Sequence, residues 1–134
     1  MSDDVAKKRE ALIAHMSAER GYLPKPWHYV AEHDVDFLQA YNDLYERSLN
    51  DGQSLPIKVR EFVCIAILCH RGMEGAAVVH CERALKHGAT MQELLEAIET
   101  MIIPGGAPTF GTGLLALMKI VEQQKEKEKA AAAK

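Results

Sequence analysis

The sequence predicts an all-α fold of about six helices around a central helical hairpin. Apolar residues recur at helical spacing through most of the 134 residues, and no stretch alternates polar and apolar residues as a half-buried strand does. Apolar residues make up 48% of the chain and charged residues 26%, a balance that is typical of a folded core and not of disorder. We therefore interpret residues 1–134 as a single domain.

The N-terminal third predicts two helices and a connector between them. Residues 3–20 carry apolar positions at helical spacing, and Gly21 is suited to end this helix. Residues 21–33 contain two prolines, which predict a structured connector. Asp34 is placed to cap the next helix, and residues 50–52 have the composition of a turn that ends it.

The predicted hairpin lies in the second half of the chain. Residues 62–69 form a run that is apolar on every side, and alone it could be a buried strand. The whole segment 56–70 is too long for a typical strand, so it predicts a helix that neighbours or other subunits must cover. A turn near residues 71–72 leads into a second helix at 73–87, and Gly88 suits the position after it.

Two further helices complete the predicted fold. Residues 90–93 have the sequence of a capping box, which predicts the start of the fifth helix. Pro104 should stop this helix, and residues 104–108 predict a loop before a sixth helix near Thr112. Residues 122–134 alternate Glu and Lys and then become rich in Ala, so this tail either extends the last helix or frays.

Composition excludes several classes of function. The net charge is −3 and no long basic stripe exists, so we expect no nucleic-acid partner. No signal-peptide pattern opens the chain and the longest apolar run is too short for a bilayer, so we expect no membrane association. Three cysteines without a secretory signal predict a cytoplasmic location. The glycines at 105 and 106 lack the Gly-Lys-Ser/Thr of a phosphate-binding loop.

Metal and thiol chemistry fit the pattern poorly. His80 and His87 share a helix face but lie seven residues apart, wider than usual zinc-ligand spacing, so we expect no metal. The Cα atoms of Cys64 and Cys69 would lie ~8 Å apart on one helix, beyond the ~7 Å limit for a disulfide. Because both lie in the apolar run and Cys81 lies in an apolar stripe, we interpret all three as inert core residues.

Glu61 and His80 form the best candidate site. Glu61 stands at the edge of the apolar run, and His80 lies between Ala76 and Ala84. In an antiparallel hairpin the two residues would stand ~16 and ~12 Å from the turn, at ~1.5 Å per residue. A carboxylate and an imidazole that meet beside an apolar surface suit proton transfer. The pattern alone nevertheless favours a surface glutamate and a hydrogen-bonded structural histidine.

Several short motifs occur in a specific order and spacing. They are residues 56–61, 71–72, 80, 84–85, 88–90 and 105–108. Together they resemble the carboxymuconolactone decarboxylase superfamily, which includes the alkylhydroperoxidase D-like proteins, over roughly residues 54–120. The resemblance implies an all-helical fold built around a helical hairpin, and assembly into trimers or hexamers.

The resemblance also implies roles for particular residues. In the peroxidase-like branch a Cys-x-x-Cys pair precedes the histidine, but here those positions hold Met73 and Ala76. The thiol redox mechanism of that branch therefore does not carry over. Glu61 and His80 match the proton-relay glutamate and histidine of the family.

The decarboxylase branch of the family also lacks the cysteine pair and works without a cofactor. That branch often has Arg two residues after the histidine, where this chain has Glu82. Arg83 is one position further, and we expect it to point elsewhere.

The composition predicts a cytoplasmic protein, and the resemblance implies a homo-oligomeric, cofactor-free decarboxylase-like lyase, of a kind used in aromatic compound catabolism. It would act by acid–base chemistry, decarboxylation or a proton shift, on a small organic acid or thioester. His80 would carry the proton and Glu61 would orient His80. The residues expected to line the substrate pocket are Trp27, Met73, Ala76 and Pro108.

Two alternatives remain open on sequence grounds. One is a thiol-dependent peroxidase or reductase that uses Cys69 or Cys81 in place of the missing pair. The other is a non-catalytic, oligomeric binding subunit.

Overall fold

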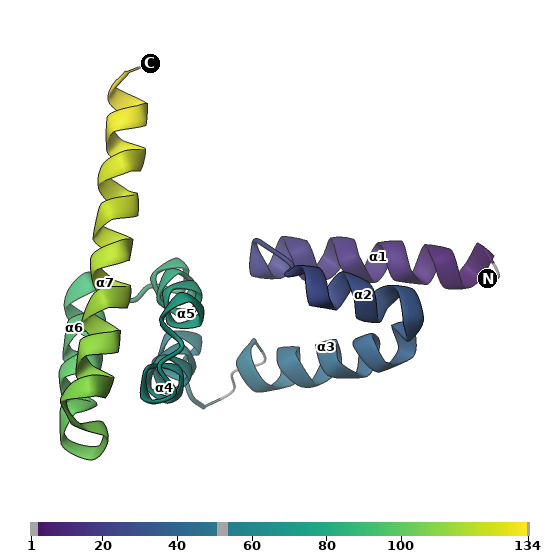
Figure 1. The fold of residues 1–134 in the computed structure, drawn as a ribbon. Helices are drawn as coiled ribbons and strands as arrows, with labels where there is room; N and C mark the ends of the chain where they lie inside the picture. Colours follow the sequence, from purple (N-terminus) through teal and green to yellow (C-terminus); the bar gives the residue numbers. More distant parts are fainter. Residues whose placement is uncertain (1–2, 51–53, 134) are drawn as a thin grey trace. The chain divides into compact units, whose positions relative to one another are not determined.

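The computed structural model describes residues 3–50 and 54–133, and the regular structure of these residues is entirely helical (Figure 1). The helices are α1 (Asp3–Arg20), α2 (Lys25–His33), α3 (Val35–Leu49), α4 (Ile57–His70), α5 (Glu74–Lys86), α6 (Met91–Thr100) and α7 (Ile102–Ala132). The all-α prediction is confirmed, with one helix more than expected in the described residues. The chain divides into two compact units, Met1–Gly52 and Gln53–Lys134, and each has its own core. The single-domain interpretation stays a prediction.

Helices α1, α2 and α3 form the first unit, in which α3 packs against both of the others. Their shared core consists of Leu12, Met16, Leu23, Ala31, Val35 and Leu38. The side chain of Asp34 accepts a hydrogen bond from the backbone N–H of Phe37 at 2.9 Å, which confirms the predicted cap of α3. Residues 51 and 52 of the predicted turn after α3 lie outside the described residues.

Helix α2 occupies residues 25–33 of the connector that was predicted at residues 21–33, and residues 21–24 remain non-helical. That prediction was wrong because Pro26 lies in the first turn of α2, where a helix has no intrahelical partner for the backbone N–H. Trp27 follows it and stacks on Tyr41 of α3, with ring centroids 4.3 Å apart. This aromatic contact therefore packs α2 against α3 within the first unit.

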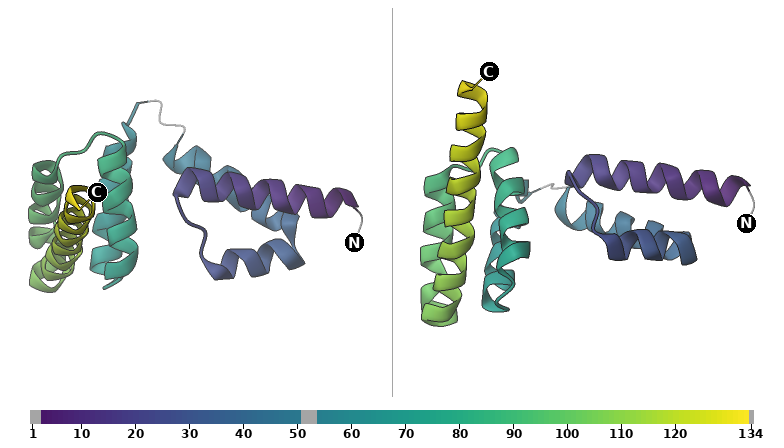
Figure 2. Two further views of the ribbon diagram at one scale, coloured as in Figure 1. Left: turned by 90° about the horizontal axis from the view of Figure 1, so that it is seen from above. Right: turned by 45° about the horizontal axis from the view of Figure 1, so that its top comes forward.

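The second unit is built on an antiparallel hairpin of α4 and α5, which lie side by side in all views (Figure 2). Gly72 lies in the tight turn between them with a φ of 69°, a conformation that costs a glycine little. Helix α7 packs against α4 and α5, and α6 packs against α7. The core of this unit includes Ile65, Cys69, Ala77, Cys81, Leu94, Ile98 and Ala116.

Helix α4 is buried on one face only. Glu61, Ile65 and Cys69 are buried along that face. Val63 and Ile67, on the other side, remain 52% and 55% exposed. The second unit therefore leaves uncovered part of the run that the sequence predicted to be covered all round.

The junction between α6 and α7 differs from the predicted loop. The capping box at Thr90 and Glu93 is present and starts α6. The loop expected at 104–108 is reduced to a kink at Gly106, where φ is 75° and ψ is 176°. Pro108 comes only two residues after the kink, so it lies in the first turn of the resumed helix and does not break it. Helix α7 then continues to Ala132 through the exposed tail, so the alternative of an extended last helix is the correct one.

No helix among the described residues combines the length and the apolar character needed to cross a bilayer.

Candidate functional site

Glu61 and His80 meet between the two helices of the hairpin. Glu61 lies in the second turn of α4 and is fully buried, and His80 lies in the middle of α5 with its side chain 20% exposed. The Nδ1 of His80 donates a hydrogen bond to Oε2 of Glu61 at 2.6 Å. The contact that the hairpin geometry predicted is therefore present, and the catalytic roles of the two residues stay a prediction.

Arg83 holds the second oxygen of the same carboxylate. Its Nε donates to Oε1 of Glu61 at 2.9 Å, and Arg83 itself is only 6% exposed. The expectation that Arg83 points elsewhere was wrong. Residues three apart on a helix are surface neighbours, so Arg83 lies on the same face of α5 as His80. That spacing was the signal available in the sequence.

Cys64 is the third group at this site. It follows Glu61 by three residues on α4 and is half-buried. Its sulfur, one oxygen of Glu61 and one ring nitrogen of His80 all lie within 4.8 Å of one another. Cys64 is therefore not the fully buried core residue that was expected, because the three-residue spacing from Glu61 places both on one helix face, and its inertness stays a prediction.

The other two cysteines do fit the interpretation as core residues. Cys69 and Cys81 are buried, and all three cysteines are free thiols. Burial raises the pKa of the Cys69 thiol, and it raises the pKa of Cys81 to about 12. Both thiols are therefore protonated and shielded at neutral pH.

Burial and hydrogen bonding set the charges of the site. Burial pushes the pKa of Glu61 up, but its bonds to His80 and Arg83 outweigh this effect and hold the pKa below its usual range. Burial pushes the pKa of His80 down, but hydrogen bonds to Cys64 and Glu61 raise it to about 9. At neutral pH the pair is thus a carboxylate and an imidazolium.

A carboxylate, a thiol and an imidazole at this distance are also donors that zinc accepts. Here both Glu61 oxygens already accept hydrogen bonds, one from His80 and one from Arg83. Hydrogen bonding within the cluster therefore accounts for its geometry without an ion.

The residues expected to line a substrate pocket have different environments. Ala76 lies one turn before His80 on α5 and is half-buried, and Met73 directly precedes the same helix and is 42% exposed. Pro108 lies exposed in α7, and Trp27 belongs to the first unit. Their role in binding a substrate stays a prediction.

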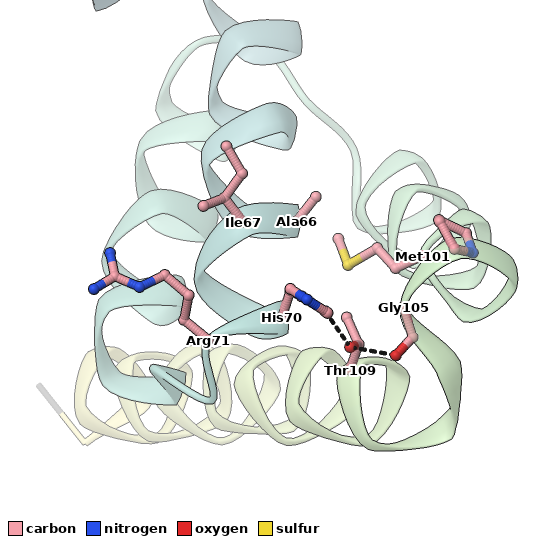
Figure 3. Close-up of a pocket in the computed structure, with 8 residues that line it drawn as sticks. Ala66, Ile67, His70, Arg71, Met101, Gly105 and Thr109 are labelled. Carbon is pink, nitrogen blue, oxygen red and sulfur yellow. Dashed lines mark hydrogen bonds between the residues drawn. The ribbon is translucent and has the colours of Figure 1, made fainter.

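A separate pocket of about 360 Å³ lies near the C-terminal end of α4 (Figure 3). Its lining residues are Ala66, Ile67, His70, Arg71, Met101, Pro104, Gly105 and Thr109. The ring of His70 points toward Thr109, with Nδ1 3.2 Å from Oγ1, and the Thr109 hydroxyl donates to the carbonyl of Gly105 at 2.7 Å. His70 follows Glu61 by nine residues, ~13 Å along the helix, so this pocket is distinct from the Glu61–His80 site.

Sequence reasoning missed this pocket. Its walls come from α4, from the α6–α7 junction and from α7, and no spacing within one helix marks it. None of the residues predicted to bind a substrate lines it.

Comparison with known proteins places this architecture in a family. A protein of Cupriavidus necator of uncharacterised function is 31% identical over 71 residues, which span 53% of this chain and 62% of that protein. An uncharacterised protein of Methanocaldococcus jannaschii is 24% identical over 89 residues, 66% of this chain and 82% of that one.

A solved structure shares the fold. It is the 1.65 Å crystal structure of a Burkholderia xenovorans LB400 protein that was named as a proposed carboxymuconolactone decarboxylase. It superposes with a TM-score of 0.77 at 27% identity and covers 94% of this chain and 98% of its own. The sequence model of the carboxymuconolactone decarboxylase family matches residues 36–119, which begins inside α3, earlier than the motifs indicated. The chain therefore belongs to the carboxymuconolactone decarboxylase family.

Proposed function

We propose that this protein is a cofactor-independent lyase that uses acid–base chemistry, decarboxylation or a related proton shift, on a small organic acid or its thioester. The observation that carries the proposal is the 2.6 Å hydrogen bond between His80 and the buried carboxylate of Glu61. The pair combines a proton carrier with a fixed anionic partner, as general acid–base catalysis requires.

His80 supplies the proton in this proposal. Loss of CO₂ from an organic acid leaves a carbanion that must be protonated, and an imidazolium with a pKa of about 9 is charged and ready at neutral pH. Glu61 engages Nδ1, so proton transfer to a substrate would use Nε2. Because the side chain is 20% exposed, solvent can return the proton after each turnover.

Arg83 acts as a positioning residue. Its bond to Oε1 of Glu61 fixes the plane of the carboxylate, and the other oxygen is then directed at His80. The buried Arg83 also keeps Glu61 ionised, which in turn favours the charged form of His80.

The test is turnover of a panel of small carboxylated lactones, 3-keto acids and acyl thioesters, with CO₂ release and NMR of the products as readouts. His80→Gln keeps a hydrogen-bonding side chain but cannot transfer a proton, so we expect a loss of roughly 10²- to 10⁴-fold in kcat. Glu61→Gln should lose less, and the two losses should not add because the pair acts as a unit. His87→Gln, on the exposed end of the same helix, is the matched control.

The pH profile of the same reaction gives a second readout. Activity that depends on the imidazolium of His80 should fall as the pH rises through about 9. Turnover that His80→Gln leaves unchanged would contradict the proposal. If no substrate of the panel turns over but one binds, the binding-subunit alternative gains support. The thiol-dependent alternative through Cys69 or Cys81 is disfavoured by the burial of both thiols.

The proposal includes a homo-oligomer, a trimer or a multiple of it. Val63 and Ile67 of α4 and Leu115 and Met118 of α7 are more than half exposed, a cost that self-association would relieve. We expect a trimer or hexamer in sedimentation equilibrium at micromolar concentration, and Ile67→Lys should weaken it. A wild-type monomer under these conditions would contradict this part of the proposal.

A further inference from the structure

We propose that Cys64 is a nucleophile of this site, and that the site accepts an α,β-unsaturated carbonyl compound. Cys64 would attack the β-carbon while His80 protonates the α-carbon. This inference shares the His80 proton with the proposed function, and it adds a covalent step and a substrate class.

Geometry makes Cys64 a member of the site. Its sulfur lies within 4.8 Å of a Glu61 oxygen and of a His80 ring nitrogen, and it is half-buried where the other cysteines are fully buried. A cysteine beside a histidine that a carboxylate orients is an arrangement that supports nucleophilic attack by sulfur. In this chain the three groups come from two helices of one hairpin, so their separation is set by helix packing.

The charged groups of the site bear on the reactivity of Cys64. Arg83 and the imidazolium of His80 bring two positive charges, and Glu61 brings one negative charge. A thiolate next to an imidazolium is electrostatically stabilised and is the nucleophilic form of cysteine.

The surroundings favour conjugate addition over acyl substitution. Attack on a thioester carbonyl builds charge on an oxygen, which enzymes stabilise with free N–H donors. Glu61, Cys64 and His80 all lie inside helices, where the backbone N–H groups are used in helix hydrogen bonds. Arg83 is bound to Glu61. In conjugate addition the charge is instead removed by a proton delivered to carbon, and His80 can deliver it.

The step balances without a further reactant. The thiolate electron pair of Cys64 forms a sulfur–carbon bond at the β-carbon, and the electrons of the double bond move toward the carbonyl to give an enolate. The α-carbon then takes the proton of His80, which becomes neutral. The net change is addition of one S–H across one carbon–carbon double bond, with no oxidant or reductant.

The experiment compares two alkylating probes on the native protein at pH 7.5. Acrylamide is an α,β-unsaturated amide whose addition needs a proton at the α-carbon, whereas iodoacetamide releases iodide and needs none. Peptide mass spectrometry measures the rate of modification at each cysteine. We expect both probes to modify Cys64 at least tenfold faster than Cys69 and Cys81, which should react only after unfolding in urea.

The ratio of the two rates tests the role of His80. At Cys64 the ratio of acrylamide to iodoacetamide rate should fall about tenfold in His80→Gln and stay unchanged in His87→Gln. Should His80→Gln not fold, the wild-type ratio as the pH rises through about 9, where His80 loses its proton, provides the same information. If His80 has only a structural role, its replacement should lower the modification rates of both probes by the same factor.

Several results would overturn the inference. A modification rate at Cys64 no higher than at Cys69 and Cys81 is one, and a rate ratio that stays constant when His80 loses its proton is another. Oxidation of Cys64 by hydroperoxide without any acrylamide adduct would also refute the choice of substrate class. Adducts at Cys64 are measured independently of turnover. A failure of the adduct experiment therefore does not affect the decarboxylation assay, and an inactive decarboxylation assay does not affect the adduct experiment.

Discussion

The raised pKa of His80 predicts how the stability of the second unit depends on pH. His80 has a pKa of about 9 in the folded protein, against 6.5 for an unperturbed histidine. A group whose pKa is raised on folding stabilises the fold fully below its unfolded pKa, and this contribution is lost as the pH rises through the folded pKa. The window for His80 therefore runs from about pH 6.5 to about pH 9.

The size of the effect follows from the shift. One pKa unit corresponds to about 1.4 kcal/mol, so a shift from 6.5 to about 9 corresponds to about 3 kcal/mol in the free energy of unfolding. The side chain is only 20% exposed, so solvent screening removes little of this figure. Within the window the slope should approach about 1.4 kcal/mol per pH unit.

The assay is urea unfolding at pH 6, 7.5, 9 and 10, followed by far-UV circular dichroism or amide exchange of α5 peptides. Trp27 is the only tryptophan of the chain and lies in the first unit, so its fluorescence would not report on this site. Other groups titrate in this range, so His80→Gln is measured in parallel. Between pH 6 and pH 10 the free energy of unfolding of the wild type should fall by about 3 kcal/mol more than that of His80→Gln.

His87→Gln, at an exposed position that ends the same helix, controls for loss of a histidine. Relative to the wild type this control should show a pH dependence of at most a few tenths of a kcal/mol. If the free energies of unfolding of the wild type and of His80→Gln change equally with pH across the range, His80 is not an imidazolium held by Glu61. The electrostatic part of the reasoning would then fail together with the proton-donor role.

Three further substitutions test the packing of the second unit. Gly113→Ala would place its Cβ 2.8 Å from Cγ2 of Ile98, so we expect the free energy of unfolding in urea to fall by ~1–3 kcal/mol. At Gly111 an added Cβ meets nothing within 4 Å, so Gly111→Ala is the control and should stabilise α7 by up to ~1 kcal/mol. Equal effects of the two substitutions would show that the α6–α7 contact is looser than described. Arg83→Met leaves the buried Glu61 with one partner fewer and should cost ~3–5 kcal/mol, and a loss below ~1 kcal/mol would show that Arg83 does not hold the carboxylate.

The predictions that held rest on chemistry that is local in sequence. Helical spacing of apolar residues marked most of the helices, and the capping box at Thr90 marked the start of α6. A helix rises a fixed distance per residue, so counting from the turn at Gly72 placed Glu61 and His80 at similar heights before any contact was seen. The 2.6 Å hydrogen bond between His80 and Glu61 confirms that the two residues meet.

The predictions that failed involve prolines and where a side chain points around a helix. Pro24 and Pro26 indicated a connector at α2, and Pro104 and Pro108 indicated a loop before α7, but a proline in a first turn is tolerated by a helix. Height along a hairpin follows from counting, whereas the direction of Arg83 and Cys64 around their helices depends on how α4 and α5 are rotated against each other. Only packing of the whole unit sets that rotation.

The sequence by itself thus determined the all-α fold, the hairpin and its two titratable residues, because these follow from periodicity and rise along the helix axis. The tertiary structure decided that Arg83 and Cys64 join them, that His80 is charged, and that a pocket of about 360 Å³ opens elsewhere on α4. Each of these depends on burial and on distances between helices. Those quantities arise only when several helices pack together, and no single segment of the chain contains them.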